Sequence, residues 1–378
     1  MKRAAALAAL LFLLLPLPAA AEETEEDVWL PPLEKADLLL FSAHGDDEHI
    51  FFAGILPYCV ARGITAQVVY MTHHRNHPVR ETERLEGLWE VGIRNLPVIS
   101  DFPDLYSETL PDAIAAYKAR RVTEQDFTDY VVANLRRFKP LVAVTHDIAR
   151  GEYDHGTHIL SAESLVKGAE LAADESYHPE SAELYGTWAT PKVYLHLWGE
   201  RPILVTSIDE PLEYFGGLTA FQVSQQGYLR HKSQLPYFMT KWLLGTDASP
   251  ITAASQIRSY SPLKYGLHST LVGEDPPGAA DFFSNVTLAK DIPPPSPSPS
   301  PEPPSPSPSP SPSPSPAPTP SPSPSPSPSL EAPPPSDVPP DDENPLRYAW
   351  VYAIITVGAG ALVCAVALPL RKIAQKAR

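Results

Sequence analysis

Two clusters of carboxylate and imidazole side chains contain the residues that could do chemistry. The first is the stretch S-A-H-G-D-D-E-H at residues 42–49, which places Asp46, Asp47 and Glu48 between two histidines and between two apolar runs. The second is A-R-G-E-Y-D-H-G-T-H at residues 149–158. Adjacent carboxylates raise each other's pKa unless a cation compensates their charge, and a divalent metal ion is the most direct compensation.

The spacing within the clusters indicates which side chains could share one ion. His44 and Asp47 lie three residues apart in a turn, so both can face a metal while Asp46 points elsewhere. His155 and His158 have the i, i+3 spacing of a helix start, so one can bind the metal while the other stays free for acid–base chemistry. Two histidines and one aspartate leave positions open for water and substrate, as in catalytic zinc sites. Asp46 is then a candidate general base.

The fold must bring these clusters together. Nearly continuous apolar runs, typical of strands buried on both faces, occur at residues 38–41, 67–71, 141–145 and 192–197. Segments of helix length cover residues 50–61, 81–91 and 127–137, and a further one starts near residue 158. Strands that alternate with helices predict an α/β fold with a Rossmann-like, mostly parallel sheet flanked by helices. Each cluster follows a predicted strand, and ligands bind at the carboxyl ends of such strands. The alternative, that these polar residues only cap helices and bridge loops, is weakened because both clusters occur after strands.

The ends of the chain differ from its middle in composition. Residues 1–21 have a basic tip, an apolar centre and an A-x-A end, which predicts a secretory signal peptide; an uncleaved anchor is the alternative. Residues 292–346 form a Pro/Ser-rich stalk that cannot build a helix or a core. Residues 347–370 are apolar and long enough to cross a hydrocarbon layer of ~30 Å as one transmembrane helix. The basic residues 371–378 then form a cytoplasmic tail.

Residues 22–291 remain as one large folded domain. Cys59 is the one cysteine in this range, so the domain has no internal disulfide. The formal net charge of −16 argues against nucleic acid as a partner. We therefore expect a single-pass protein of the cell membrane, in contact with the lipid bilayer, whose folded domain is extracellular.

The two clusters also carry a resemblance. A-H-G-D-D-E resembles the A-H-P-D-D-E signature of the PIG-L/LmbE-like family of metal-dependent N-acetylglucosaminyl deacetylases, and G-E-Y-D-H-G-T-H resembles its second signature, G-x-Y-G-H-P-D-H. R-E-T-E at 80–83 resembles the family's R-x-x-E helix, and H-K-S-Q at 231–234 resembles its H-x-S-Q element. Y-G-L-H-S-T, followed by D-F-F, resembles its closing strands. The resemblance covers residues 36–285.

The resemblance implies a role for each matching residue. The implied metal ligands are His44, Asp47 and His158, with Zn²⁺ as the cofactor or Fe²⁺ in its place. Asp46 matches the general base, and His155 matches the histidine that stabilises the oxyanion as an imidazolium. Tyr153 matches a tyrosine that closes over the tetrahedral intermediate. A second alignment would pair Glu152 and His155 with the family's two histidines, but it loses one histidine and misplaces Tyr153.

Three further residues are assigned to substrate binding: Arg80, Glu48 and His231. Glu48 could equally orient the histidines or Arg80 from behind, and His49 is expected to be structural. Two positions depart from the family pattern, since Gly45 replaces Pro and Gly156-Thr157 replaces Pro-Asp. Because Thr157 carries no charge, the protonation of His155 would depend on another acid, for which Asp104 and Asp147 are candidates.

The implied function is removal of an acetyl group from an N-acetylglucosamine-containing glycan or glycoconjugate by a metal-activated water. One alternative is a carbohydrate-binding module that has kept the fold without catalysis. Another is an amidase or esterase that acts on a different acyl group, since acyl specificity depends on pocket shape.

Overall fold

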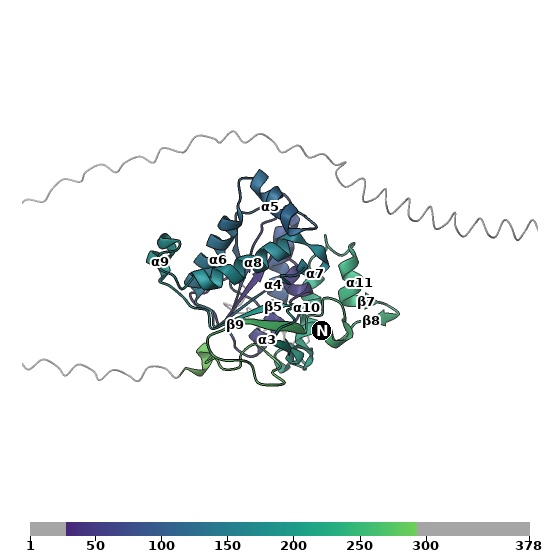
Figure 1. Ribbon diagram of the computed structural model, residues 1–378. Coiled ribbons are helices and arrows are strands. Elements are labelled where there is room, and N and C mark those ends of the chain that lie inside the picture. The colour runs from purple at the N-terminus through teal and green to yellow at the C-terminus, as the bar shows by residue number, and fades with distance from the viewer. Residues whose placement is uncertain (1–27, 293–378) are drawn as a thin grey trace, which may run out of the picture. The chain divides into compact units, whose positions relative to one another are not determined.

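The computed structural model describes residues 28–292 of the chain (Figure 1). The expected signal peptide, transmembrane helix and basic tail lie outside these residues, as does the expected stalk beyond its first residue, Ile292. Among the described residues, no helix is both long and apolar enough to cross a membrane.

A seven-stranded sheet of order β3-β2-β1-β4-β5-β9-β6 forms the centre of the domain. Its strands are β1 (Leu38–Ser42), β2 (Ala66–Tyr70), β3 (Val98–Ile99), β4 (Val142–Thr145), β5 (Lys192–His196), β6 (Pro202–Leu204) and β9 (Lys264–Thr270). The strands from β3 to β5 in this order pair in parallel, whereas β9 pairs antiparallel with β5 and β6. The predicted α/β fold with a mostly parallel sheet is therefore confirmed. A small hairpin of β7 (Gly245–Thr246) and β8 (Ser249–Pro250) lies outside this sheet.

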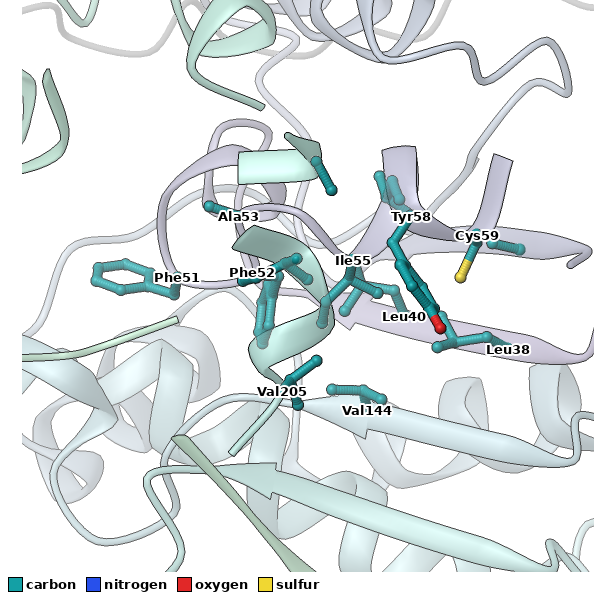
Figure 2. Close-up of a cluster of buried hydrophobic side chains, with 14 of the residues drawn as sticks. Leu38, Leu40, Phe51, Phe52, Ala53, Ile55, Tyr58, Cys59, Val144 and Val205 are labelled. Atoms are coloured by element: carbon teal, nitrogen blue, oxygen red, sulfur yellow. The ribbon is translucent and has the colours of Figure 1, made fainter. Parts of the chain in front are cut away.

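The inner strands are buried on both faces, and their side chains alternate between two hydrophobic clusters. On β1, Leu38 and Leu40 contribute to one cluster, while Leu39 and Phe41 contribute to the other. All four side chains are fully buried. Figure 2 shows the first cluster, in which Leu38, Leu40 and Val144 from the strands lie near Phe52, Ile55 and Tyr58. Burial on both faces explains why these strands are apolar at every position.

Helices cover both faces of the sheet (Figure 1). The cluster with Leu38 contains residues of α3 (Ile55–Ala61), α4 (Pro78–Glu90) and α10 (Ala220–Tyr228). The cluster with Leu39 contains residues of α5 (Leu110–Ala119), α6 (Glu124–Phe138) and α8 (Gly156–Leu171). The shorter α-helices are α2 (Asp47–Ile50), α7 (Gly151–Asp154), α9 (Pro179–Tyr185) and α11 (Phe238–Leu244). Short 3₁₀ turns are η3 (Thr206–Asp209), η4 (Glu213–Phe215), η5 (Ala254–Gln256) and η6 (Ala289–Asp291).

The predicted helix at residues 50–61 is wrong in one respect, because the chain breaks it into α2 and α3. Gly54 separates the two with a φ of +92°, a conformation that residues with a Cβ rarely adopt. A Cβ at this position would also lie 2.7 Å from the Cβ of Ile208. The stretch is otherwise apolar, so the signals of the break are Gly54 and Pro57, which lies in the first turn of α3.

The strand order reverses at β1, which pairs with β2 on one side and with β4 on the other. Open α/β sheets bind ligands at such a switch point, in the crevice at the carboxyl ends of the strands. The segments at 43–48 and 146–158 follow β1 and β4, so the topology brings the two chemical clusters to this edge.

Candidate active site

Hydrogen bonds to its backbone fix the loop after β1. The Thr72 hydroxyl donates to the carbonyl of Ala43 at 2.7 Å, and the Ala43 N–H donates to Nε2 of His146 at 2.9 Å. The His44 N–H donates to Oδ2 of Asp47 at 2.8 Å. The side chains of His44 and Asp47 are thus held in a turn whose backbone is anchored to the ends of β2 and β4.

Three side-chain atoms converge at the crevice. Nδ1 of His44 lies 3.1 Å from Oδ2 of Asp47 and 3.1 Å from Nε2 of His158, and the last two atoms are 3.4 Å apart. Ligands of one tetrahedral zinc ion, at about 2.0–2.1 Å from it, lie roughly 3.3–3.4 Å from one another. The three atoms therefore have the spacing of three corners of a metal site. His155 and His146 each also lie near two of these ligands, within 4.8 Å.

The charges around these atoms favour a cation. Burial lowers the pKa of His44, but the carboxylates of Asp104 and Asp47 outweigh burial and raise this pKa to about 10. Burial raises the pKa of Asp47, but His158 and His44 outweigh it and hold this pKa below its ordinary value. Nε2 of His44 lies 3.3 Å from Oδ1 of Asp104 yet makes no hydrogen bond. Positive charge is thus stabilised between the buried Asp47 and the partly exposed Asp104, so the donor set and the electrostatics fit a divalent metal.

Glu152 lies behind this group and contacts three histidines. Its Oε2 is 2.5 Å from Nδ1 of His158 and 3.1 Å from Nδ1 of His146, and its Oε1 is 2.9 Å from Nδ1 of His196. Burial raises the pKa of Glu152, but His146 and His158 outweigh burial and keep it well below its ordinary value. Glu152 therefore faces Nδ1 of His158, whereas Nε2 of that ring faces His44 and Asp47.

The backbone at Glu152 is strained. Its φ of +63° and ψ of −86° fall outside the regions that residues with a Cβ ordinarily occupy. Such strain persists only where surrounding contacts enforce it, and it is frequent at functional sites. The contacts to the three histidines and the N–H of Asp147, which donates to Oε1 at 3.0 Å, provide that enforcement.

Asp46 lies at the entrance to the group, with 13% of its side chain exposed. Nη2 of Arg80 is 3.3 Å from its Oδ1, and Nη1 of Arg80 is 3.1 Å from Oδ2 of Asp104. Burial raises the pKa of Asp46 to about 6, although Arg80 opposes this. Arg80 thus forms ion pairs with two carboxylates. It therefore orients Asp46 and does not extend freely toward substrate.

His155 begins helix α8 and stacks on the candidate ligand His158, with ring centroids 4.4 Å apart and an interplanar angle of 10°. Its Nδ1 accepts the N–H of Thr157 at 3.3 Å, so the ring proton resides on Nε2. Burial lowers the pKa of His155 well below its ordinary value. The structure therefore favours a neutral imidazole that donates from Nε2, where the resemblance implied an imidazolium.

Neither Asp104 nor Asp147, the two acids expected to support the protonation of His155, forms a hydrogen bond or an ion pair with it. Asp104 forms ion pairs with His44, His74 and Arg80. Asp147 accepts the N–H groups of the next residues in its own turn. Across residues 28–292, no carboxylate forms a hydrogen bond or ion pair with His155.

Tyr153 lies beside the stacked rings of His155 and His158, with its ring centroid 5.5 Å and 5.6 Å from theirs. Its ring centroid is 5.8 Å from that of Phe51 and 5.9 Å from that of Phe238. In the described part of the chain its hydroxyl has no hydrogen-bond partner, so it is available to a substrate. Burial raises the pKa of Tyr153 well above its ordinary value, which keeps the hydroxyl protonated.

The substrate-binding roles predicted for Glu48 and His231 are wrong in this structure. Both residues are completely buried, because α2 and the segment after α10 turn them into the core. The hydroxyl of Tyr70 donates to Oε1 of Glu48 at 2.6 Å. The H-x-S-Q element instead contacts the R-x-x-E helix through Ser233, whose N–H and hydroxyl both donate to Glu83.

Sequence reasoning missed several residues of the site. His146 directly follows β4 and His196 ends β5, so their positions at strand ends were an available signal. Tyr106 was also missed; its ring lies 5.1 Å from that of His155, and 63% of the residue is exposed. Tyr106 and the 61% exposed Phe238 flank His155 and Tyr153 at the mouth of the site.

The chain is similar to known proteins over part of its length. Residues 39–167 match the model of the family described as PIG-L: GlcNAc-PI de-N-acetylase. The chain is 28% identical over 188 residues to a 1D-myo-inositol 2-acetamido-2-deoxy-alpha-D-glucopyranoside deacetylase of Streptomyces avermitilis, a match that covers 44% of this chain and 61% of the relative. It is 25% identical to a protein of the same description from Catenulispora acidiphila, covering 45% of this chain and 58% of the relative. The chain thus spans about three fifths of the length of these relatives.

Among solved structures, the N,N'-diacetylchitobiose deacetylase of Pyrococcus horikoshii aligns with 62% of this chain and 85% of its own length. The TM-score of that alignment is 0.40 and the sequence identity is 13%.

Proposed function

Because this chain belongs to the PIG-L family through residues 39–167, we propose that it is a metal-dependent N-deacetylase. Its substrate would be a glycan or glycoconjugate that contains N-acetylglucosamine, and its products would be an amine and acetate. The observation that carries the proposal is the convergence of Nδ1 of His44, Oδ2 of Asp47 and Nε2 of His158 beside the partly exposed carboxylate of Asp46.

The same three residues would hold the metal. Two imidazoles and one carboxylate suit Zn²⁺, with Fe²⁺ as a chemically similar substitute. When bound, such an ion lowers the pKa of water and polarises a carbonyl oxygen.

The side chains around the ligands would carry out the proton transfers. Asp46 takes a proton from the attacking water, since Arg80 fixes one of its carboxylate oxygens and its pKa lies near neutrality. His155 donates from Nε2, and Tyr153 donates from its free hydroxyl, to the oxygen of the acetamide carbonyl as negative charge develops on it. Asp46 then returns its proton to the leaving nitrogen as the carbon–nitrogen bond breaks. The balance is one water consumed, with one amine and one acetate released.

A sugar substrate is supported by the relatives and by the mouth of the site. Both relatives are described as deacetylases of an acetamido-glucopyranoside. Tyr106 and Phe238 present exposed rings on either side of His155 and Tyr153. Exposed aromatic rings around a catalytic group are suited to contact with the apolar face of a sugar.

Acetate release tests this function directly. The full chain, loaded with Zn²⁺, should release acetate from N-acetylglucosamine and its oligomers, and a chelator should abolish the release. A chain that binds the metal and the sugar but releases no acetate would favour the carbohydrate-binding alternative. Faster release from O-acetyl or longer N-acyl analogues would favour the esterase or amidase alternative.

The cellular location is part of the same proposal and rests on the composition of residues 1–21 and 347–378. We propose that the catalytic domain lies outside the cell, joined by the Pro/Ser-rich segment to one transmembrane helix. Protease added to intact cells should release a fragment that contains the catalytic domain. Digestion of the C-terminal tail alone would contradict this orientation.

A further inference from the structure

A second group of metal-ligating side chains lies in the core and plays no part in the proposed reaction. It consists of Glu48 and His49 on α2 and His231 after α10. All three residues have no exposed surface. The group shares no residue with the candidate active site.

The polar atoms of this group are largely without partners. Both ring nitrogens of His49, both ring nitrogens of His231, and Oε2 of Glu48 are buried and make no hydrogen bond. A neutral imidazole carries one N–H donor and one acceptor nitrogen, so two complete rings are unsatisfied. A buried polar group without a partner is destabilising and calls for a missing partner.

The unpartnered ring nitrogens lie near the carboxylate of Glu48. Oε1 of Glu48 lies 3.5 Å from Nε2 of His49 and 4.0 Å from Nε2 of His231, and one ligand atom from each residue falls within 4.8 Å of the others. Separations of roughly 3.3–4 Å are those of ligands around one transition-metal ion. Tyr70 donates to Oε1 of Glu48, which fixes the carboxylate as a second layer of contacts commonly does around a metal.

Gly87 has no side chain, which lets the two imidazoles approach the backbone of α4 closely. A Cβ on Gly87 of α4 would lie 2.6 Å from Nε2 of His49 and 2.8 Å from Nε2 of His231. The next atom it would meet is the carbonyl oxygen of Gly227, at 3.2 Å. Two imidazole nitrogens and the carbonyl oxygen of Gly227 therefore lie close together beside Gly87, and all three atoms can coordinate a cation.

We propose that Glu48, His49 and His231 form a second, structural metal site, which takes zinc or a similar divalent transition-metal ion. Two imidazoles and one carboxylate form a donor set that suits such ions, and Oε2 of Glu48 is available as a fourth ligand. The guanidinium groups of Arg80 and Arg84 are close enough to act on His231, but carboxylates compensate their charges. Arg80 pairs with Asp46 and Asp104, and Arg84 pairs with Glu81. Complete burial excludes substrate, so the ion would connect α2 to the segment after α10 and would stiffen the loop that carries Asp46 and Asp47.

Metal stoichiometry tests the site without any assay of activity. The full chain is stripped with a chelator, titrated with Co²⁺, desalted and analysed for bound cobalt, with visible absorption to report coordination. We expect about two ions per wild-type chain. His231→Gln should retain the ion at the active site only, and His158→Gln should retain the core ion only. His268→Gln, which changes a half-buried histidine of β9 outside both groups, should behave as wild type.

A second variant tests the same site independently, in case His231→Gln does not fold. Gly87→Ala places a methyl group against both imidazole nitrogens and should also lower the stoichiometry by one ion while leaving all ligand residues in place. Co²⁺ should raise the unfolding temperature of the wild type more than that of either variant. A wild-type chain that binds a single ion, lost entirely in His158→Gln, overturns the proposal, whatever the folding of the other variants.

Discussion

Oε2 of Glu152 lies 2.5 Å from Nδ1 of His158, on the side of the imidazole away from His44 and Asp47. A carboxylate at Nδ1 holds the ring proton there and leaves the lone pair of Nε2 pointing at the candidate metal position. Carboxylates in this position orient ligand histidines and increase their basicity. The second alignment of the signatures, which pairs Glu152 and His155 with the family's two histidines, gives His158 no role and so does not account for this contact.

Glu152→Gln should therefore weaken metal binding although it removes no proposed ligand. Glutamine can accept hydrogen bonds through one oxygen only, so its NH₂ group would face the N–H of either His146 or Asp147 with a donor of its own. We expect the affinity for Zn²⁺ to fall about 10–100-fold, measured by competition with a chromogenic chelator. The exposed Glu183→Gln is the matched control and should bind as wild type does. Unchanged affinity in Glu152→Gln, with complete loss in His158→Gln, would limit Glu152 to a role in folding.

Asp46 and Asp47 are adjacent, but substitution of Asp46 should lower acetate release, whereas substitution of Asp47 should lower metal content. Asp46→Asn keeps size and shape but cannot accept a proton, so metal content should persist while acetate release falls at least ~10²-fold. Asp47→Asn removes an anionic ligand and should lower metal content itself. Metal analysis and acetate release on the same preparations separate the two effects. Equal acetate release from wild type and Asp46→Asn would refute the assignment of the general base.

The sequence predicts the fold and the site where local pattern and topology agree. The apolar runs that become β1, β2, β4 and β5 are buried on both faces, so their composition alone distinguishes them from loops. Because these strands are parallel, their carboxyl ends must share an edge, and the meeting of His44 with His158 follows from that topology. The edge strands β3 and β6 have two and three residues, too few to produce a periodic pattern.

Side-chain direction is the part that the sequence could not supply. Glu48 is next to the candidate ligand Asp47, yet the first turn of α2 directs it into the core, where it meets His231 from a segment far along the chain. Likewise, nothing local to Glu152 indicates its left-handed backbone, which depends on His196 of β5 as well as on nearby residues. These contacts are long-range and become visible only in the folded chain.

Gly156 replaces the proline of the family pattern, and its lack of a side chain should be required for stability. A Cβ here would lie 2.2 Å from the carbonyl oxygen of Thr109, a backbone atom that cannot move alone, and the Gly156 N–H donates to the carbonyl of Ser107 at 2.7 Å. Gly156→Ala should lower the free energy of unfolding by roughly 1–3 kcal/mol, the usual cost of overpacking, measured by urea denaturation. Gly199→Ala is the matched control, because no atom lies within 4 Å of the added Cβ. Equal stability of Gly156→Ala and Gly199→Ala would show that the segment before α5 can shift away from the added methyl group at little energetic cost.

Acid should destabilise the fold in part through His74. Burial lowers the pKa of this histidine to about 4 from an ordinary value of 6.5, and its Nε2 accepts the N–H of Gly45 at 3.2 Å. The unfolded chain therefore binds a proton at this position at a higher pH than the folded chain. The resulting stability is complete above pH 6.5 and is lost as the pH falls toward 4, by up to about 3 kcal/mol. His74→Gln keeps a hydrogen-bond acceptor without a titration in this range, so its free energy of unfolding should fall less between pH 7 and pH 4.5 than that of the wild type. Urea denaturation of the chelator-treated chain at the two pH values measures the difference, with the exposed His77→Gln as control. The same fall in wild type and His74→Gln would assign the acid sensitivity to other buried groups.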